Sequence, residues 1–319
     1  MKKILVTGAL GQIGSELTVA LRQKYGESNV IATDVRPNNK ATLANGPFHI
    51  ADVCNPGTLA EIVNKEKVDT IFHLAAILSA RGEKDPQFCW NINMGGLMNI
   101  LELARTNGVK EVVTPSSMAV WGPNAPQYNT PQESALKPTT MYGVTKVCGE
   151  RVCDYYVQKY GLDCRGLRYP GIISSETLPG GGTTDYAVEI FYDAVKTHRY
   201  SCFLNEKSTL PMMYMPDCIH ATISLAEAEF KNLKHHSDFN VAAFSFNPKE
   251  LAEVIKKFMP DFQIEYNPDF RQAIADSWPK SIDDSAAREE WNWKPKYDME
   301  TMTKDMLEIL TKKHEAGLI

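Results

Sequence analysis

The sequence has 319 residues, 43% hydrophobic and 23% charged, which is an ordinary composition for a globular chain able to bury a large core. Its net charge of −5 and isoelectric point near 5.9 exclude a basic surface for nucleic acid or acidic lipid, and so favour a small-molecule partner. Seven cysteines without a C-x-x-C pair indicate reduced thiols, and no apolar run is long enough to span a membrane, so we expect a cytoplasmic protein.

In chain order, the first half of the sequence alternates short apolar strands with amphipathic helices. Strands are expected at residues 2–7, 30–33, 48–51, 70–74, 112–115 and 164–167. Helices are expected between them, the longest at residues 87–107, closed by Gly108, and 140–159, closed by Gly161. This alternation predicts right-handed crossovers and therefore an α/β fold, a Rossmann-type doubly wound parallel sheet.

Beyond the sixth expected strand the pattern changes. Residues 174–185 are rich in serine, threonine and glycine and are expected to form a mobile loop. Further helices are expected among short strands, at residues 184–197, 216–230, 248–259 and 299–313. We interpret residues 1–170 as the Rossmann domain, extended by later segments at about 210–245, and residues 171–319 mainly as a smaller α/β lobe towards the C-terminus.

A glycine-rich turn joins the first strand to the first helix, with Gly8, Gly11 and Gly14 in it. Such glycines let the backbone approach a pyrophosphate, and the following helix offers free N–H groups and a partial positive charge to the anion. Asp34 ends the second strand, where a carboxylate accepts hydrogen bonds from the adenosine ribose and repels a 2′-phosphate. Arg36 could attract that phosphate, but a solvated surface arginine explains it better, so the sequence favours NAD over NADP.

A tyrosine and a lysine four residues apart, Tyr142 and Lys146, share one face of the helix expected at 140–159. Two other tyrosine–lysine pairs have this spacing, so the spacing alone is weak. Only Tyr142 follows a serine pair, Ser116 and Ser117, at the carboxyl end of a strand, where ligands bind in open parallel sheets. We therefore take this tyrosine, this lysine and one of these serines as the candidate catalytic residues.

These residue types suit the removal of a hydroxyl proton while a hydride leaves the same carbon. A phenol with a pKa of about 10 becomes an effective base only if positive charge stabilises the phenolate. At ~5 Å and an effective dielectric constant of ~20, one ammonium contributes roughly 3 kcal/mol, or about 2.4 pKa units. Oxidised NAD would add a second positive charge. We therefore expect Tyr142 to act as the general base near neutral pH, with a serine hydroxyl holding the substrate oxygen.

Taken together, the motifs resemble those of the extended short-chain dehydrogenases, a family best known for sugar-nucleotide 4-epimerases. The resemblance covers essentially the whole chain. It rests on the glycine turn, Asp34, residues 73–76, Ser116-Ser117, Tyr142 with Lys146, and residues 167–171. Asn93 is similar to the family's structural asparagine, which relays through water to the catalytic lysine. With the turn and its flanks, the resemblance implies cofactor contacts at Gly8, Gly11, Gln12, Ile13, Gly14, Asp34, Arg36, Asp52, Val53, Leu74, Ala75, Ala76, Asn93, Tyr142, Lys146, Tyr169, Pro170 and Ile172.

Two segments, residues 179–187 and 276–284, resemble signatures of the short-chain L-threonine 3-dehydrogenases within this family. The resemblance implies NAD-dependent oxidation of L-threonine at C3 to 2-amino-3-oxobutyrate, with the C-terminal lobe binding substrate. It also implies a homodimer built from the helices that carry Tyr142 and residues 87–107. The substrate residues that it implies are Ser79, Ser117, Tyr142, Gly180, Thr184 and Trp278. Ser116 could share the role of Ser117, and Asp185 could assist the substrate amine.

The alternative is an NAD-dependent sugar-nucleotide epimerase or dehydratase on the same scaffold. Such enzymes usually carry an arginine that grips the diphosphate just before the motif corresponding to residues 214–217, whereas residues 211–216 here include no cation. A redox-sensing NAD-binding regulator is a third possibility, but the complete set of candidate catalytic residues disfavours it. Histidines and cysteines show no metal-site spacing, so no metal is expected, and neither is a nucleic-acid or membrane partner.

Overall fold

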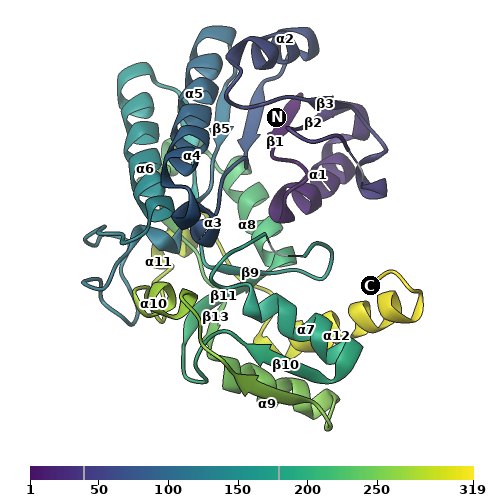
Figure 1. Cartoon of the computed structure of the whole chain (residues 1–319). Coiled ribbons are helices and arrows are strands. Elements are labelled where there is room, and N and C mark those ends of the chain that lie inside the picture. Colours follow the sequence, from purple (N-terminus) through teal and green to yellow (C-terminus); the bar gives the residue numbers. More distant parts are fainter. Residues whose placement is uncertain (39, 179) are drawn as a thin grey trace.

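The computed structural model describes residues 1–38, 40–178 and 180–319. Figure 1 shows a body of strands flanked by helices, and below it a smaller lobe that contains α7, α9, α10 and β10. Pro179, which begins one of the signature segments, lies outside the described residues. Among the helices that are described, none is both long enough and apolar enough to cross a membrane.

The central sheet of the body has six parallel strands in the order β3-β2-β1-β4-β5-β7. Their bounds are β1 Ile4–Thr7, β2 Val30–Asp34, β3 Phe48–Ile50, β4 Thr70–His73, β5 Glu111–Val113 and β7 Asp163–Arg165. Ile4 of β1 lies opposite Val30 on one side and Thr70 on the other, so the strand order reverses direction at β1. The predicted doubly wound parallel sheet is confirmed, and the crevice beside β1 is where such sheets bind ligands.

One edge of this sheet continues past its carboxyl end as a second set of parallel strands in the order β12-β8-β6. Their bounds are β6 Ser116–Ser117, β8 Leu167–Tyr169 and β12 Phe239–Asn240. Gly166 separates β7 from β8 at a close backbone crossing, because a Cβ there would lie 2.4 Å from the Thr114 carbonyl oxygen. The strand predicted at 112–115 is wrong in its bounds because β5 ends at Val113, and the one predicted at 164–167 is wrong because that run is divided between β7 and β8.

Helices cover both faces of the body. Their bounds are α1 Gln12–Tyr25, α2 Pro56–Glu66, α4 Pro86–Trp90, α5 Gly96–Asn107, α6 Met141–Tyr160 and α8 Met215–Glu227. α8 returns from the second half of the chain to pack against α1, and α5 packs against both α2 and α6. The helix predicted at 87–107 contains five residues of π-helix, Asn91–Gly95, between α4 and α5. Such π turns frequently occur at functional sites.

The lobe combines two small sheets with helices. Its strands are β9 Gly171–Ile173, β11 Leu210–Tyr214 and β13 Phe244–Phe246 in one sheet, and β10 Arg199–Cys202 with β14 Gln263–Tyr266 in the other. Its main helices are α7 Tyr186–Thr197, α9 Pro248–Phe258 and α12 Met299–Glu315. These three confirm the helices predicted at 184–197, 248–259 and 299–313, apart from end residues. Shorter helices are α3 Ser79–Lys84 in the body, and α10 Arg271–Asp276 and α11 Ser285–Trp291.

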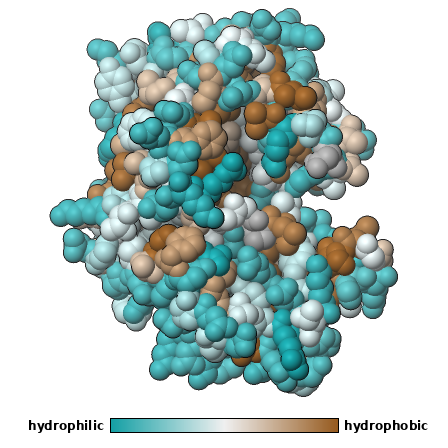
Figure 2. Space-filling view, viewed as in Figure 1, coloured by the Kyte–Doolittle hydropathy of each residue, from teal (hydrophilic) through white to brown (hydrophobic). Residues whose placement is uncertain are grey.

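The lobe is held together by an apolar core that extends into the body as far as Tyr142 of α6. α7 is buried at eight of its twelve positions, and Met302, Met306 and Leu310 of α12 belong to the same apolar cluster. Figure 2 shows a mainly polar surface that is hollowed at its right-hand edge, between the α1 side of the body and the end of α12 seen in Figure 1. A boundary at residue 170 between a cofactor domain and a substrate lobe stays a prediction.

Candidate active site

The turn between β1 and α1 leaves room for a ligand to approach the backbone. Gly8 has a φ of +67°, and a Cβ on it would lie 2.7 Å from the backbone nitrogen of Ala75, just after β4. A Cβ on Gly14 would lie 2.2 Å from the Gly8 carbonyl oxygen, so only glycine lets α1 begin against the turn. Within the described chain, no side chain caps α1 and no acidic residue lies in its first turn. Its free N–H groups therefore keep their attraction for an anion.

The residues around this turn fit a dinucleotide. The side-chain nitrogen of Gln12 is buried and has no hydrogen-bond partner among the described residues, which is unusual unless a ligand supplies one. Ile13 and Ile172 pack against the same apolar cluster, which also contains Tyr169. Leu74 and Ala75 both lie within contact distance of the Gly8 position. The predicted cofactor residues of two separate segments thus meet at the glycine turn.

Asp34 is buried at the end of β2 and faces both the turn and Arg36. Its carboxylate accepts hydrogen bonds from the Leu10 backbone nitrogen at 3.0 Å and from the Arg36 backbone and Nε at 3.2 and 3.1 Å. The Arg36 side chain is otherwise 63% exposed. Since the arginine is paired with this carboxylate, its charge is neutralised and attracts a 2′-phosphate less. The buried carboxylate would repel such a phosphate, so the arrangement fits NAD better than NADP.

The next strand end contributes Asp52 and Val53, two of the residues that the resemblance implies as cofactor contacts. The Asp52 carboxylate accepts a hydrogen bond from the Cys54 backbone nitrogen at 2.8 Å, which shapes the turn after β3. Val53 packs closely on α5, since a Cβ on Gly96 would lie 2.7 Å from its side chain. Both residues therefore have local structural partners, and their contact with the cofactor stays a prediction.

The structure brings Ser117, Tyr142 and Lys146 together where β6 meets α6. Tyr142 is buried, and burial raises its pKa to about 12 even though a hydrogen bond from Ser117 lowers it. The Lys146 Nζ lies 5.5 Å from the centre of the Tyr142 ring and donates to the Pro115 carbonyl oxygen at 2.7 Å. Burial lowers the pKa of Lys146 to about 8. The cluster is a phenol, a hydroxyl and an ammonium at the carboxyl edge of the sheet.

The sequence led us to expect a phenol near neutrality only with the ammonium and oxidised NAD acting together, and that expectation stays a prediction. Without the cofactor, the pKa of Tyr142 is raised. The reason is that burial removes the hydration a phenolate needs, and the hydrogen bond from Ser117 offsets only part of this cost. A second positive charge next to the phenol is needed before it can act as a base near neutral pH.

The two adjacent serines face different partners. The Ser117 Oγ reaches Tyr142 and accepts a hydrogen bond from the Ala119 backbone nitrogen at 3.2 Å. The Ser116 Oγ instead donates to the Glu150 carboxylate at 2.5 Å, on the other side of the strand. Consecutive side chains of a strand point to opposite faces, so only one of the pair can face the phenol. In this structure that residue is Ser117.

Asn93 connects the end of β4 to α6. Its side-chain oxygen accepts a hydrogen bond from the Ile77 backbone nitrogen at 2.8 Å, and its amide nitrogen donates to the Ile77 carbonyl at 3.1 Å. The same amide nitrogen donates to the Thr145 hydroxyl at 3.0 Å, next to Lys146. Asn93 thus fixes the loop after β4 against the catalytic helix, and its predicted relay to the lysine stays a prediction.

His73 and Tyr169 support the site with side chains that have partners elsewhere. The His73 Nδ1 lies 2.9 Å from the Thr7 hydroxyl, and burial lowers the pKa of His73 to about 3, so the imidazole is neutral. The Tyr169 hydroxyl hydrogen-bonds Thr222 of α8, and its ring belongs to a buried apolar cluster. A contact from Tyr169 to the cofactor would therefore come from its backbone.

Two distant segments that carry predicted substrate residues meet at the start of α3. The hydroxyl of Ser79, at the start of α3, lies 3.3 Å from the hydroxyl of Thr183 in the glycine-rich loop. Thr184 packs against β9, since a Cβ on Gly171 would lie 2.8 Å from its Cβ. Gly180 lies beside Leu78. The loop after β9 and the start of α3 thus form one wall, lined with hydroxyl groups.

The shape of that loop depends on Asp185, for which assistance to the substrate amine was only one possibility. Its carboxylate accepts hydrogen bonds from the backbone nitrogens of Gly181 and Gly182 at 2.9 and 2.7 Å. Burial raises the pKa of Asp185 to about 6. Gly181 has a φ of +96°, and a Cβ on Gly182 would lie 2.6 Å from the carboxylate. The carboxylate is used to fold the loop, which the run of three glycines followed by Asp185 could have indicated.

The same loop is tied to α1 at its beginning. Ser174 donates to the Glu16 carboxylate at 2.5 Å, and the hydroxyls of Thr177 and Ser15 lie 3.2 Å apart. The Lys40 Nζ donates to both of these hydroxyls, at 2.7 and 3.0 Å. The segment that leads to the glycine-rich loop therefore contacts the first turns of the helix that follows the glycine turn.

Trp278 is buried, with 5% of its surface exposed. It belongs to the same apolar cluster as Tyr142. It also forms part of the wall of a cavity of about 360 Å³, together with Gln272 and Lys280. Its contact with substrate stays a prediction.

Comparison with known proteins agrees with this site. A family model described as the NAD dependent epimerase/dehydratase family matches residues 4–242. An uncharacterized epimerase/dehydratase from Staphylococcus saprophyticus is 49% identical over 318 residues, which cover 99% of both chains. An L-threonine dehydrogenase structure from Clostridium difficile is 53% identical, with a TM-score of 0.96 and 98% of both chains covered. Another, from Cupriavidus necator, is 49% identical, with a TM-score of 0.95, 97% of this chain and 99% of the other covered.

A UDP-glucose 4-epimerase from Thermotoga maritima has a TM-score of 0.84 but is only 22% identical, so it shares the fold alone. The resemblance to L-threonine 3-dehydrogenases predicted from the sequence motifs is thus confirmed at about half of all positions. These similarities support a nicotinamide-dinucleotide-dependent oxidoreductase that acts on a small molecule. The chain belongs to the NAD dependent epimerase/dehydratase family.

Proposed function

We propose that this protein oxidises L-threonine at C3 to 2-amino-3-oxobutyrate, with NAD as the hydride acceptor. The observation that carries the proposal is the assembly of Ser117, Tyr142 and Lys146 at the carboxyl edge of the sheet, where Lys146 lines one pocket with Ala75, the residue that adjoins Gly8. The extensive similarity to L-threonine dehydrogenases supports the choice of substrate. Ser116, which is bonded to Glu150, has a structural role in this proposal.

Each residue of the cluster has a distinct part in the reaction. The Ser117 hydroxyl orients the substrate hydroxyl, and the Tyr142 phenolate accepts the proton of that hydroxyl as the C3–H bond breaks. The Lys146 ammonium stabilises the phenolate. Oxidised NAD, when bound, accepts the hydride and adds the second positive charge that a buried phenolate requires. The products are the C3 ketone, NADH and one proton, which Tyr142 passes on.

The expected substrate wall fits a small zwitterion. Ser79 and Thr184 would supply hydroxyls and Gly180 its backbone N–H, since the N–H groups of Gly181 and Gly182 are bonded to Asp185. Hydrogen-bond donors and not an arginine would therefore hold the carboxylate. β11 is buried along its whole length and its five residues include no cation. A diphosphate would therefore lack the charge-assisted partner that sugar-nucleotide enzymes provide at this strand.

We propose that residues 1–170, with the segment at 210–245, bind NAD, and that residues 171–319 mainly bind the substrate. The packing of α8 on α1 supports the extension of the cofactor domain. We also propose a homodimer through α4, α5 and α6. Five large apolar side chains are exposed on these helices: Phe88, Trp90, Met98, Tyr155 and Tyr160.

The proposal is tested by mixing the purified protein with NAD and L-threonine and following NADH absorbance. We expect NADH to form with L-threonine and not with D-threonine, whose hydroxyl would point away from Tyr142 when its amine and carboxylate are held. UDP-glucose is the matched probe for the alternative function. Epimerisation of this sugar without net NADH formation, together with no NADH formation from L-threonine, would contradict the proposal and support the epimerase hypothesis.

A further inference from the structure

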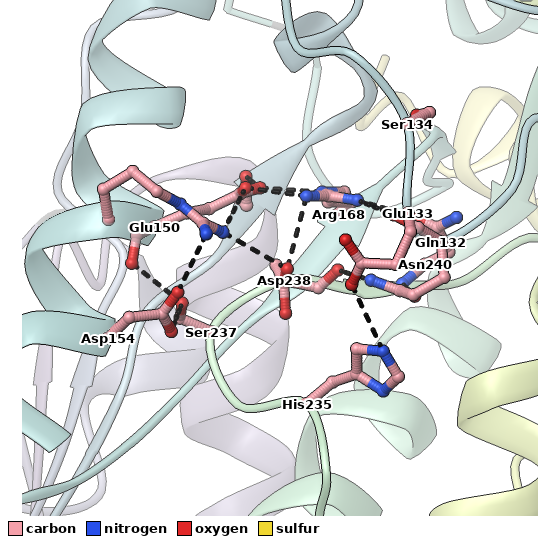
Figure 3. Close-up of polar contacts among 12 residues, drawn as sticks. Gln132, Glu133, Ser134, Glu150, Asp154, Arg168, His235, Ser237, Asp238 and Asn240 are labelled. Atoms are coloured by element: carbon pink, nitrogen blue, oxygen red, sulfur yellow. Dashed lines mark hydrogen bonds and ion pairs between the residues drawn. The ribbon is translucent and has the colours of Figure 1, made fainter. Parts of the chain in front are cut away.

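A buried ion pair lies next to β6, the strand that carries the candidate catalytic serine. Arg168 of β8 donates from Nε and Nη2 to the two carboxylate oxygens of Glu150 on α6, each at 2.8 Å. The two side chains are only 2% and 1% exposed. Figure 3 shows the guanidinium and the carboxylate facing each other, with Asp238 beside them. The mechanism proposed above gives this pair no part.

The guanidinium of Arg168 is bound on all sides. Its Nη1 donates to the Gln132 carbonyl oxygen at 3.0 Å and to the Asn240 side chain at 3.2 Å, and its Nη2 reaches Asp238 at 3.4 Å. It also lies over the Trp121 ring, 5.4 Å from the ring centre. Because arginine keeps its proton in proteins, this arrangement fixes a permanent positive charge opposite Glu150. The carboxylate is thereby held by two charge-assisted hydrogen bonds.

Glu150 in turn contacts the catalytic strand and shares a helix face with the catalytic lysine. Its carboxylate accepts the hydrogen bond from Ser116, the residue before Ser117. On α6 it follows Lys146 by one turn and Tyr142 by two, so the three residues share a helix face. Ser116, Lys146 and Glu150 also line one internal cavity of about 30 Å³. The ion pair therefore adjoins both elements whose relative position defines the site.

We propose that Glu150 is a positioning residue for the reaction: fixed by Arg168, its carboxylate holds the strand of Ser117 against α6 and presents a negative charge to the Lys146 ammonium. The inference rests on the proposed function, which gives Ser117 and Lys146 their catalytic roles. It goes beyond that function because it gives a charged residue an effect on the reaction although this residue contacts neither substrate nor cofactor.

The surroundings of Lys146 define what this charge does. Burial lowers the pKa of Lys146 to about 8, while Cys153 and Glu150 on α6 and Cys89 on α4 act in the opposite direction. From β4 the lysine faces His73, whose pKa of about 3 leaves it neutral. Among these residues around Lys146, Glu150 is the one with a carboxylate. Loss of its charge should lower the pKa of Lys146, and the ammonium should then be lost at a lower pH.

The first test is Glu150→Gln, which keeps the side-chain shape and removes the charge. The alkaline limb of the pH profile of kcat/KM reports loss of the Lys146 ammonium, so this limb should move down by about half a pH unit or more. We also expect kcat to fall by about tenfold, an effect of the size seen for groups that orient catalytic residues. An unmoved limb in a folded variant would overturn the proposal.

A second measurement is independent of turnover. An NMR titration of isotopically labelled lysine, with the Lys146 signal assigned through Lys146→Arg, should show its pKa shifted down in Glu150→Gln. If the lysine shifts as expected but the wild-type protein does not oxidise L-threonine, the proposed function fails and the electrostatic role of Glu150 stands. If the enzyme oxidises L-threonine and the lysine does not shift, the inference fails alone.

Two further variants separate positioning from folding. Glu150→Gln combined with Arg168→Met removes both charges, which a fold tolerates better than one unpaired buried charge. We expect the double variant to recover the wild-type melting temperature, while the alkaline limb of its pH profile stays shifted. If this limb returned to its wild-type pH, the role of Glu150 would be structural only. Glu111→Gln is the matched control. Glu111 is also buried near an arginine, Arg165 at 3.6 Å, but at the opposite end of β5, so this change should leave the limb in place.

Discussion

At position 142 a buried phenol lies beside a buried ammonium, and their two pKa values are displaced in opposite directions. The pKa of Tyr142 is about 12 and that of Lys146 about 8, so near neutral pH the phenol keeps its proton. A general base is most effective when its pKa lies near the working pH. The site therefore has to lower the pKa of the phenol when the reactants assemble, and a cationic nicotinamide is the charge that would do so.

This leads to a prediction about protons. A positive charge beside Tyr142 favours the phenolate and lowers its pKa, so binding of NAD should release protons at mildly alkaline pH. Calorimetry in two buffers with different ionisation enthalpies measures that release. NADH, whose nicotinamide is neutral, should release fewer protons, and so should Tyr142→Phe with NAD. Equal release by all three combinations would contradict a cofactor-dependent phenolate.

The serine pair gives a second prediction at this scale. Ser117→Ala removes the hydroxyl that contacts Tyr142 and should lower kcat by about 10²-fold or more, the range for groups acting in proton transfer. Ser116→Ala removes only the hydrogen bond to Glu150 and should lower kcat by no more than about tenfold. Steady-state kinetics with NAD and L-threonine compare the two variants. A larger loss in the Ser116 variant would reverse the assignment.

At the scale of elements, the junction of β1 and α1 requires glycines, because any other residue would bring a Cβ too close to the backbone. Gly14→Ala would place a Cβ 2.2 Å from the Gly8 carbonyl oxygen, so α1 must move away from the turn. We expect NAD to bind at least about tenfold more weakly, a loss of about 1.4 kcal/mol. Gly95→Ala is the matched control, because Gly95 is helical and a Cβ there meets nothing within 4 Å.

Isothermal titration with NAD measures this difference directly. The control should keep wild-type affinity and gain slightly in melting temperature, since alanine is a better helix former than glycine. If both variants bind NAD like the wild type, the glycine turn is not where the cofactor phosphates lie.

Local patterns account for the parts of the fold and site that the sequence predicts. The glycine turn, the strand-end Asp34 and the four-residue spacing of Tyr142 and Lys146 are each encoded within a few residues, so they can be recognised without a structure. The parallel sheet follows from the alternation of strands and helices. These patterns sufficed for the fold class, and the cofactor and catalytic residues that they indicate stay predictions.

Features that depend on distant partners could not be predicted in this way. The choice between Ser116 and Ser117 depends on where Glu150 and Arg168 meet, and no local pattern records that meeting. The raised pKa of Tyr142 depends on how completely the fold buries it. The folding role of Asp185 depends on the left-handed backbone of Gly181. Each is a consequence of packing between segments.

At the scale of the whole molecule, the apolar side chains exposed on α4, α5 and α6 predict self-association. We expect light scattering to give a mass twice that of the 35.7 kDa chain. Met98→Glu, on the exposed face of α5, should give a monomer, because a charge would be buried in the interface. Leu318→Glu changes an exposed residue at the C-terminus and should leave the mass unaltered.

A monomeric wild-type protein would contradict this prediction, and the comparison leaves room for it, since one similar structure is described as a monomeric L-threonine 3-dehydrogenase. If the wild-type protein is a dimer and Met98→Glu is a monomer, the activity of the variant will show whether the site needs a second subunit.

The hydrogen-bonded junction of Ser15 and Glu16 with Ser174 and Thr177 joins the two expected ligand sites. One side belongs to the helix that follows the glycine turn, and the other begins the loop that carries Thr184. Through such a shared junction, a ligand that orders one site lowers the cost of ordering the other. Thermodynamic reciprocity then requires that NAD and the amino acid strengthen each other's binding by the same factor. Oxidised cofactor and alcohol substrate would thus bind more tightly together than separately. After the reaction, the release of either product would weaken the binding of the other.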